Sequence, residues 1–573
     1  MSEILLYYKR PDPTTWVYMS SFLTIGLYFV FHRFWSVRNL DIVLLILLAP
    51  GLLVVYEGRR REIRQTELLV RKQVEQEKDY RPAKHMTSVL SVLPVLALAQ
   101  FGDDSAGGQT ESEEPATKDT TPVPSTTVPS TTKDNEARRD AEASASAPIA
   151  DRTPETSTIT GATPDDERND VIPNILSREG EAVASNEMDE ADEVDTASET
   201  DTFSPTDVQR WGFIYLFVIE AFLLVRLMLD PLMVRRPLLD PNLTTGGLNF
   251  IGISLFIFMM ANVIASSPRI QVEQGPKLGP GYALMNMLPA IPTRPVSESI
   301  GGALPIPNEE LNTNQARLSQ VAKSLAIAAQ LALVVAIVLI GNRHFSNLRA
   351  GVGCATLYLM LPYTAQFTGR VDHALPAALL LWAVLSYRRP MIAGIFLGLA
   401  GGLVYYPLFL LPLWISFYWQ RGARQFSVGV VAMLVVLMVG LWFDDSASLW
   451  EHLRRMFGIL NPNREIDQFR GIWALGWNPI WRLPAIVAFV ILSVFFAIWP
   501  AQKNLGTLMS GTAVIMVASQ FWHGYFGGLY LAWFLPLLLL TIFRPNLQDR
   551  IATKVVIDGP TQPRGNKSEI ATV

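Results

Sequence analysis

Long runs of uncharged apolar residues dominate this chain of 573 residues. Half of the residues are hydrophobic and only 17% are charged, whereas a soluble domain carries about 25% charged residues. A membrane-spanning helix needs about 20 consecutive apolar residues, and many runs in this chain approach that length. The single cysteine, Cys354, excludes an intramolecular disulfide framework and a cysteine-based zinc site. The sequence therefore predicts an all-α polytopic membrane protein.

The apolar runs predict about 14 transmembrane helices. Single spans are expected at 16–31, 40–56, 211–229, 248–265, 321–340, 350–367, 374–386, 426–443, 483–499, 505–521 and 525–542. The run 391–419 is too long for one helix and contains Gly401, Gly402 and Pro407, so it is interpreted as a hairpin of two short helices. A short apolar run at 87–99 completes the count.

Arginine and lysine near the ends of spans favour the cytoplasmic side of a membrane. Arg59–Arg61 place the segment after the second span inside, and the arginines at 235–236, 343, 349, 388–389, 421 and 424 alternate consistently with it. Both termini are then predicted to be cytoplasmic in a multi-pass protein of the cytoplasmic (inner) membrane.

The charge of the chain is divided unevenly. Residues 101–210 contain 27 acidic and 8 basic residues, a net charge of −19 within a chain whose net charge is −5. This segment is also rich in Ser, Thr and Pro, so we expect it to be a disordered linker. The predicted organisation is N-terminal membrane-anchoring helices at 1–100, the linker at 101–209, a transmembrane core at 210–545 and a cytoplasmic tail at 546–573.

Motifs of soluble enzymes are not found in the sequence. It contains no phosphate-binding loop, no Gly-x-Ser-x-Gly elbow and no His-Glu-x-x-His pair, and its six histidines are scattered. We therefore expect no cofactor and no nucleic-acid partner, and no metal is required, although Asp444-Asp445 could bind one.

Polar residues gather on the side predicted to be outside. The loop 266–320 carries Glu273, a candidate general base. The loop 444–482 carries Arg464 and Arg470, which either pair with nearby acids on a solvated surface or face an anionic group, because guanidinium binds phosphate oxygens in pairs. The turn 369–373 contributes Arg370, Asp372 and His373, and the turn 522–528 contributes His523. Glu220, near the middle of the predicted span 211–229, is either functional or hydrogen-bonded between helices.

Two segments resemble a known family. Residues 363–413 contain a polar turn at Gly369, a basic turn at Arg388-Arg389, Gly394 with Gly398, Tyr406-Pro407 and Leu410-Leu411-Pro412. Together with residues 519–540, this stretch is similar to the central and last helices of GT-C class membrane glycosyltransferases, especially the bacterial polyprenol-phosphate-mannose-dependent alpha-mannosyltransferase-like family. Thr368 and Arg370 replace the Asn and Gln of the family pattern, and Val404 replaces its Lys.

The resemblance implies a GT-C-like helical core, a lipid-linked sugar donor, an active site on the outer face and inversion at the sugar carbon assisted by a carboxylate. The acid of the family lies in the first outer loop, where this chain offers Glu273 but no Asp.

Two hypotheses follow. The first is a glycosyltransferase of the cell envelope that uses a polyprenyl-phosphate sugar, with Asp372 or Glu273 as base. Arg370, Arg464 and Arg470 would face the lipid phosphate, and His373, Tyr405, Tyr406 and His523 would contact substrate. The second is a non-catalytic membrane protein, such as a transporter, a lipid-handling protein or a scaffold, which includes a transferase fold that has lost its chemistry.

Overall fold

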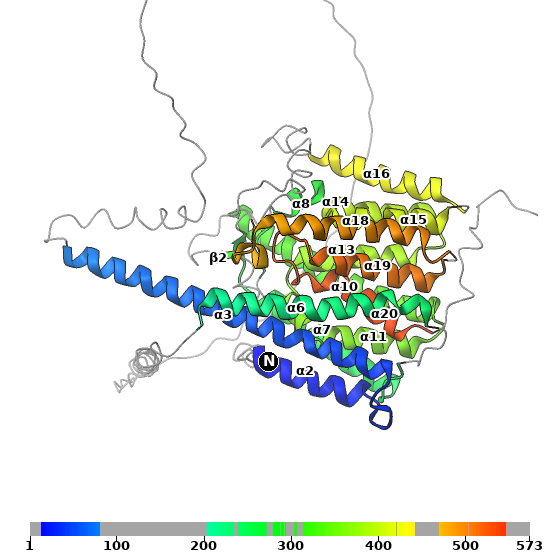
Figure 1. Ribbon diagram of the computed structural model, residues 1–573, viewed down its shortest axis with the longest axis horizontal. Coiled ribbons are helices and arrows are strands. Elements are labelled where there is room, and N and C mark those ends of the chain that lie inside the picture. Colours follow the sequence, from blue (N-terminus) through cyan, green and yellow to red (C-terminus); the bar gives the residue numbers. More distant parts are fainter. Residues whose placement is uncertain are drawn as a thin grey trace, which may run out of the picture. The chain divides into compact units, whose positions relative to one another are not determined.

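The computed structural model describes residues 13–80, 203–233, 239–271, 279–286, 288–291, 293, 303–305, 313–419, 421–441, 469–501 and 503–545. These residues form a bundle of α-helices (Figure 1). The two strands among them, β1 (Arg269–Gln271) and β2 (Ala303–Pro305), pair antiparallel, with Ile270 opposite Leu304. The linker, the run 87–99 and the tail from residue 546 lie outside the described residues.

The helices follow one another as α2 (Pro13–Tyr28), α3 (Val37–Tyr80), α6 (Pro205–Met228), α7 (Thr245–Ala265), α8 (Pro280–Asn286), α10 (Thr313–Arg343), α11 (Leu348–Met360), α12 (Pro362–Gln366), α13 (Val371–Leu385), α14 (Pro390–Leu403), α15 (Leu411–Tyr418), α16 (Ala423–Leu441), α18 (Arg482–Ile498), α19 (Leu505–Gln520) and α20 (Leu535–Phe543). Single 3-10 turns lie at Phe31–Arg33, Asp230–Leu232, Tyr406–Leu410, Gly471–Ala474, Pro479–Trp481 and Leu531–Trp533.

In the described ranges, five helices are long and apolar enough to cross a membrane: α3, α6, α7, α10 and α16. The helices α11, α13, α14, α18 and α19, and α15 with the turn before it, are apolar but shorter. The predicted class, an all-α membrane protein, is confirmed at this level. The total of 14 crossings stays a prediction.

Two predicted spans differ from the helices that the structure contains. The run 391–419 is broken as expected, but α14 continues through Gly401 and Gly402 and ends at the extended residue Val404, before Pro407. The prediction of one helix over 525–542 was wrong in its first half, where Phe526 and Gly528 adopt positive φ angles of 51° and 90° that a helix does not accept. Only α20 is helical there, apart from the turn Leu531–Trp533.

The N-terminal helices pack directly on the core. Gly51 of α3 lies so close to α6 that an added Cβ would meet the side chain of Leu216 at 2.7 Å. The hydroxyl of Tyr28, at the end of α2, donates to the carbonyl of Gly353 in α11 over 2.8 Å. The described residues up to Val74 belong to the same compact unit as the described residues from 203 onward.

The bundle has two chemically different ends. At one, which we call the loop end, Gly58 of α3 approaches Gln209 of α6, Arg210 donates to the carbonyl of Leu475, and Arg470 pairs through its backbone with Tyr525. The opposite end, the arginine end, gathers Arg38, Arg349, Arg388, Arg389, Arg421, Arg424 and Arg544, with Arg38 bonded to Asp240 and Arg349 to Pro241.

This arrangement conflicts with part of the membrane topology that the sequence predicted. The sequence placed the segment after residue 56 inside and the loop 444–482 outside. The described parts of both lie at the loop end, since Gln209 donates to Glu62 of α3 and its neighbour Arg210 reaches Leu475. Those two expectations therefore cannot both hold.

Candidate functional site

The loop end contains a buried ion pair between Arg370 and Asp372. Arg370 precedes α13 and Asp372 lies in its first turn, where a carboxylate interacts favourably with the helix dipole. Arg370 donates through Nε to Oδ1 over 2.9 Å and through an NH2 group to Oδ2 over 2.7 Å. Both residues are buried. The turn needs a glycine before the arginine, because a Cβ at Gly369 would lie 2.3 Å from the carbonyl oxygen of Ile291.

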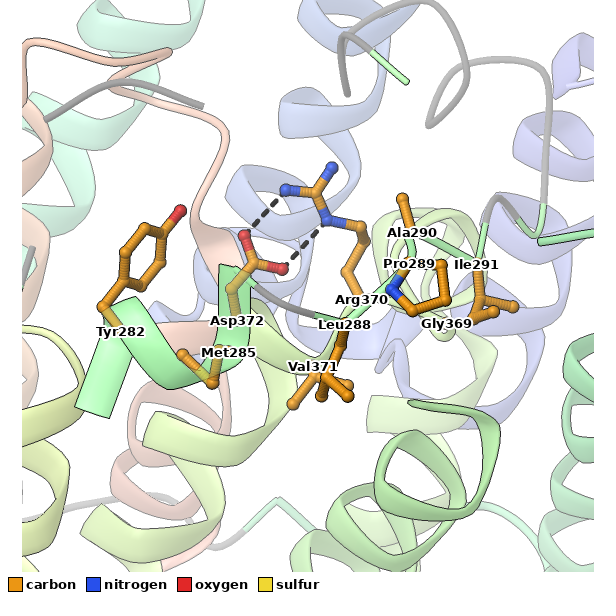
Figure 2. Close-up of a pocket in the computed structure, with 10 residues that line it drawn as sticks. All are labelled: Tyr282, Met285, Leu288, Pro289, Ala290, Ile291, Gly369, Arg370, Val371 and Asp372. Atoms are coloured by element: carbon orange, nitrogen blue, oxygen red, sulfur yellow. Dashed lines mark hydrogen bonds and ion pairs between the residues drawn. The ribbon is translucent and has the colours of Figure 1, made fainter. Parts of the chain in front are cut away.

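This ion pair forms one wall of a pocket. Figure 2 shows the pair beside the ring of Tyr282, with apolar side chains completing the lining. The lining residues are Tyr282, Met285, Leu288, Pro289, Ala290, Ile291, Gly369, Arg370, Val371 and Asp372. Tyr282 is buried, and its hydroxyl has no hydrogen-bond partner among the described residues. The pocket thus combines a charged wall, an unpartnered hydroxyl and an apolar wall.

A column of stacked rings begins behind the pair. His373 lies between Phe367 and Tyr530, with ring centroids 4.5 Å from each. The column continues from Tyr530 to His523 at 4.7 Å and from His523 to Tyr406 at 4.8 Å. Tyr405 ends it, 4.3 Å from Tyr406.

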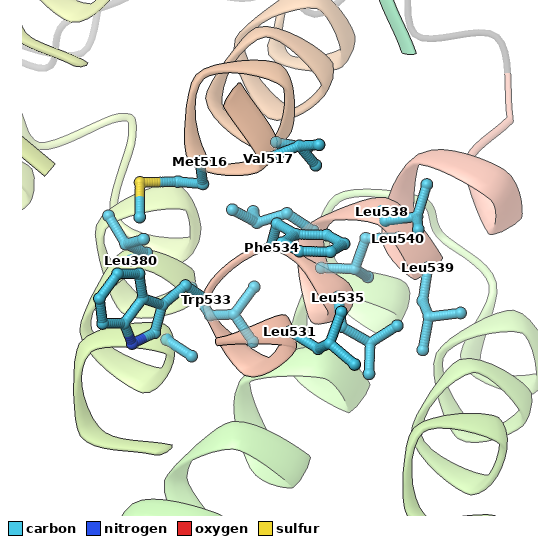
Figure 3. Close-up of a cluster of buried hydrophobic side chains, with 14 of the residues drawn as sticks. Leu380, Met516, Val517, Leu531, Trp533, Phe534, Leu535, Leu538, Leu539 and Leu540 are labelled. Carbon is cyan, nitrogen blue, oxygen red and sulfur yellow. The ribbon is translucent and has the colours of Figure 1, made fainter. Parts of the chain in front are cut away.

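The segment that leads into α20 supports both the ion pair and the ring column. Trp533 donates from Nε1 to the backbone carbonyl of Asp372 over 3.0 Å, which ties the start of α13 to the turn before α20. Figure 3 shows Trp533 among buried Leu, Met and Phe side chains. Through Trp533, a close-packed apolar cluster therefore fixes the position of the Arg370–Asp372 pair.

The electrostatic environment keeps His523 neutral. Burial, with Arg482 nearby, lowers the pKa of His523 to about 3. Its Nδ1 accepts from the backbone N–H of Tyr525 over 3.0 Å, which is consistent with a neutral ring. Burial likewise raises the pKa of Tyr525 to about 12. Arg482 itself lies 4.4 Å from the ring centroid of Phe469 and donates to the carbonyl of Trp522.

Of the residues predicted from the sequence, the structure brings together Arg370, Asp372, His373, Tyr405, Tyr406 and His523. Arg470 lies at the same end, paired with Tyr525. Glu273 and Arg464 lie outside the described residues.

Sequence reasoning missed three neighbours: Tyr282, Tyr530 and Trp533. Tyr530 and Trp533 follow His523 within one aromatic-rich segment, which was a usable signal. Tyr282 carried none, since it reaches the site only through the tertiary fold. A fourth neighbour, Arg482, is one of the arginines of the loop 444–482 that the sequence singled out as a group.

Among the described residues, no group of three or more His, Cys, Asp or Glu side chains is placed to hold a metal ion. Comparisons with family models, with curated proteins and with solved structures found no match to this chain.

Proposed function

We propose that this protein is a membrane glycosyltransferase that moves a sugar from a polyprenyl-phosphate donor to an acceptor hydroxyl. The observation that carries the proposal is the buried Arg370–Asp372 pair, which lines a half-apolar pocket at one end of an apolar helical bundle. A lipid-linked phosphosugar needs this combination: an apolar path for its chain, a cation for its phosphate and a carboxylate for the reacting hydroxyl.

Each of these groups has its own role in the proposed reaction. The acceptor oxygen forms a bond to the anomeric carbon while the bond from that carbon to the phosphate oxygen breaks, and the phosphate leaves with the electron pair. Asp372 takes the proton of the attacking hydroxyl, since an ionised carboxylate has about four acceptor sites and Arg370 occupies two of them. Arg370 offsets the negative charge of the phosphate in a site of low dielectric constant, where fixed donors are most effective. Arg464 and Arg470 are further phosphate ligands in this proposal, and Glu273 is a second candidate base.

The remaining candidates shape the site. His373, Tyr405, Tyr406 and His523 belong to the ring column, which is buried, and in this proposal the column forms the wall against which the sugar binds.

The proposal places the loop end outside the cytoplasmic membrane. The arginines gathered at the other end support this orientation, because arginine-rich ends are retained on the cytoplasmic side, and the proposal sets this group above Arg59–Arg61, which lie at the loop end. In this orientation the start of α2 and residues 57–74 of α3 are also outside, so the proposal departs from the cytoplasmic N-terminus and the inside placement of Arg59–Arg61 that the sequence predicted.

The test is transfer from a labelled polyprenyl-phosphate sugar by the purified protein in nanodiscs. The Asp372→Asn protein should lose transfer. The matched control is Asp240→Asn, because Asp240 is an exposed carboxylate at the arginine end, paired with Arg349, and its loss should leave transfer unchanged. No transfer by the parent across a panel of donors would refute the proposal.

One observation favours a second candidate, a non-catalytic membrane protein. Both oxygens of Asp372 are already bonded by Arg370, as in a pair whose role is structural. The double variant Arg370→Gln/Asp372→Asn separates the two, because it keeps a neutral hydrogen-bonded pair without a base. A parent with no transfer would support the second candidate, whereas a folded double variant with full transfer would show that the pair is structural and that the base lies elsewhere.

A further inference from the structure

Glu220 is a buried carboxyl group that the proposed site does not use. It lies midway along the membrane-spanning helix α6, and its side chain is fully buried. Neither carboxyl oxygen has a hydrogen-bond partner among the residues that the structure describes. An isolated charge in such surroundings is very costly, so a carboxyl group there is neutral unless it is paired.

Asp230, near the end of the same helix, shows the contrast. It is also fully buried, but it forms ion pairs with Arg226 at 3.6 Å and with Arg544. The chain therefore compensates one buried acid with two arginines and leaves the other without any.

Within the described part of the chain, no charged side chain around Glu220 compensates its charge. Residues 505–520 of α19, which packs on α6, have no charged side chain. On α3 the charged residues Asp41 and Arg59 lie toward the two ends of its contact with α6, where Asp41 binds Arg226 and Arg59 binds Glu62. The turn 471–474 is uncharged. The titratable groups of the segment 521–534 are His523, Tyr525 and Tyr530, and none of them bonds to Glu220.

Glu220 faces the segment 521–534, the non-helical part of the chain's return from α19. A Cβ added at Gly528 would lie 3.8 Å from its Oε2. One turn earlier on α6, the ring of Phe217 packs on Phe521 with centroids 5.3 Å apart. The backbone N–H of Gly528 donates to Gln520 over 3.3 Å, so it does not serve the carboxylate.

We propose that Glu220 is a proton-binding site in the middle of the membrane, and that its carboxylic acid form holds the segment 521–534 against α6. Loss of the proton leaves a charge without a partner beside Gly528, and the segment must then move to admit water or a cation. Because this segment carries His523 and Tyr530, proton occupancy at Glu220 is linked to the geometry of the ring column. The inference does not depend on sugar transfer.

The first test is an infrared difference spectrum between the parent protein and Glu220→Gln in nanodiscs at pH 7. Glutamine copies the shape of the neutral acid, so the variant should fold. The parent should show a carboxylic acid C=O band that the variant lacks and that shifts in D2O. Ionised carboxylate bands in its place would overturn the proposal. Asp240→Asn is the control, since an exposed carboxylate should give only carboxylate bands.

The second test addresses the coupling by amide hydrogen exchange over residues 521–530, comparing the two proteins at the same pH. Exchange should match at a pH where the carboxylic acid band of Glu220 is present, and should be faster in the parent than in Glu220→Gln at a pH where that band has disappeared. Equal exchange after the band has disappeared would overturn the coupling.

A third measurement needs no variant. An apolar carbodiimide reacts with protonated carboxyl groups, so peptide mapping of the parent should find Glu220 modified and Asp230 unmodified. Modification of Asp230 alone, or of both acids equally, would contradict the proposal.

Discussion

Arg370 and Asp372 are both buried, and each compensates the charge of the other. Removing one member of a buried pair leaves an uncompensated charge, which typically costs about 3–5 kcal/mol. The same pair lines the pocket, so its structural and chemical roles must be separated by experiment.

We predict that Asp372→Asn lowers the free energy of unfolding by about 3–5 kcal/mol. The double variant Arg370→Gln/Asp372→Asn should recover most of this loss, because no charge stays buried alone. Denaturant unfolding in detergent, followed by tryptophan fluorescence, measures both. A double variant as unstable as the single one would show that charge compensation is not the main role of the pair.

His523 gives a prediction on pH. An unfolded chain binds a proton at a histidine near pH 6.5, whereas folded His523 does so only at about 3. Its contribution to stability is therefore complete above pH 6.5 and falls as the pH decreases toward 3, by up to about 1.4 kcal/mol per pH unit. His523→Gln should flatten the dependence of the unfolding free energy on pH over this range. An unchanged slope would show that the ring is not buried in its neutral form.

At the scale of single residues, the sequence pointed to much of the candidate site. Arg370, Asp372, His373 and His523 could be predicted because they are polar groups in short turns between apolar runs. Tyr282 could not, since its place in the pocket depends on how the segment after α7 folds back over α13.

At the scale of secondary-structure elements, the closest contacts are between packed helices. The helices α14 and α16 cross so tightly that a Cβ at Gly394 would lie 2.2 Å from the carbonyl oxygen of Phe426, and one at Gly429 would lie 2.3 Å from that of Met391. Small residues allow such backbone approach in membrane helices. The hairpin of α14 and α15 was predictable from Pro407, but this packing against α16 was not.

We predict that Gly394→Leu separates α14 from α16 and lowers the midpoint of thermal unfolding by several degrees, because overpacking typically costs about 1–3 kcal/mol. Gly246→Leu is the matched control, since a Cβ there meets nothing within 4 Å. Similar midpoints for the two variants would argue against the close crossing.

The segment 525–542, which is helical mainly in its second half, was the least predictable element. Its apolar composition indicated one span over 525–542, and hydropathy carries no information about the positive φ angles at Phe526 and Gly528. The non-helical part is the part that supplies Tyr530 and Trp533 to the site.

At the scale of the whole molecule, the N-terminal helices are built into the bundle. Arg226 of α6 binds Asp41 of α3 over 2.7 Å and also contacts Asp230, which binds Arg544 after α20. These buried ion pairs join the first, middle and last parts of the described chain. Sequence patterns predicted the membrane class but not this integration, since a long acidic segment separates α3 from α6.

The two ends of the bundle predict the sidedness of cysteine labelling. Gln65→Cys and Ala474→Cys should react with a membrane-impermeant maleimide from the same side, and Arg389→Cys from the opposite side. All three positions are exposed, and the native Cys354 is fully buried. Labelling of the first two from opposite sides would contradict the arrangement of α3 and α6.

The claim that a lipid-linked sugar reacts beside Arg370 and Asp372 is tested most directly by photo-crosslinking. A polyprenyl-phosphate sugar with a diazirine next to its phosphate should label peptides from residues 279–293 and 369–373, and excess unlabelled donor should compete. Labelling confined to the arginine end, at residues 386–389 or 421–424, or labelling that the unlabelled donor does not reduce, would contradict the account.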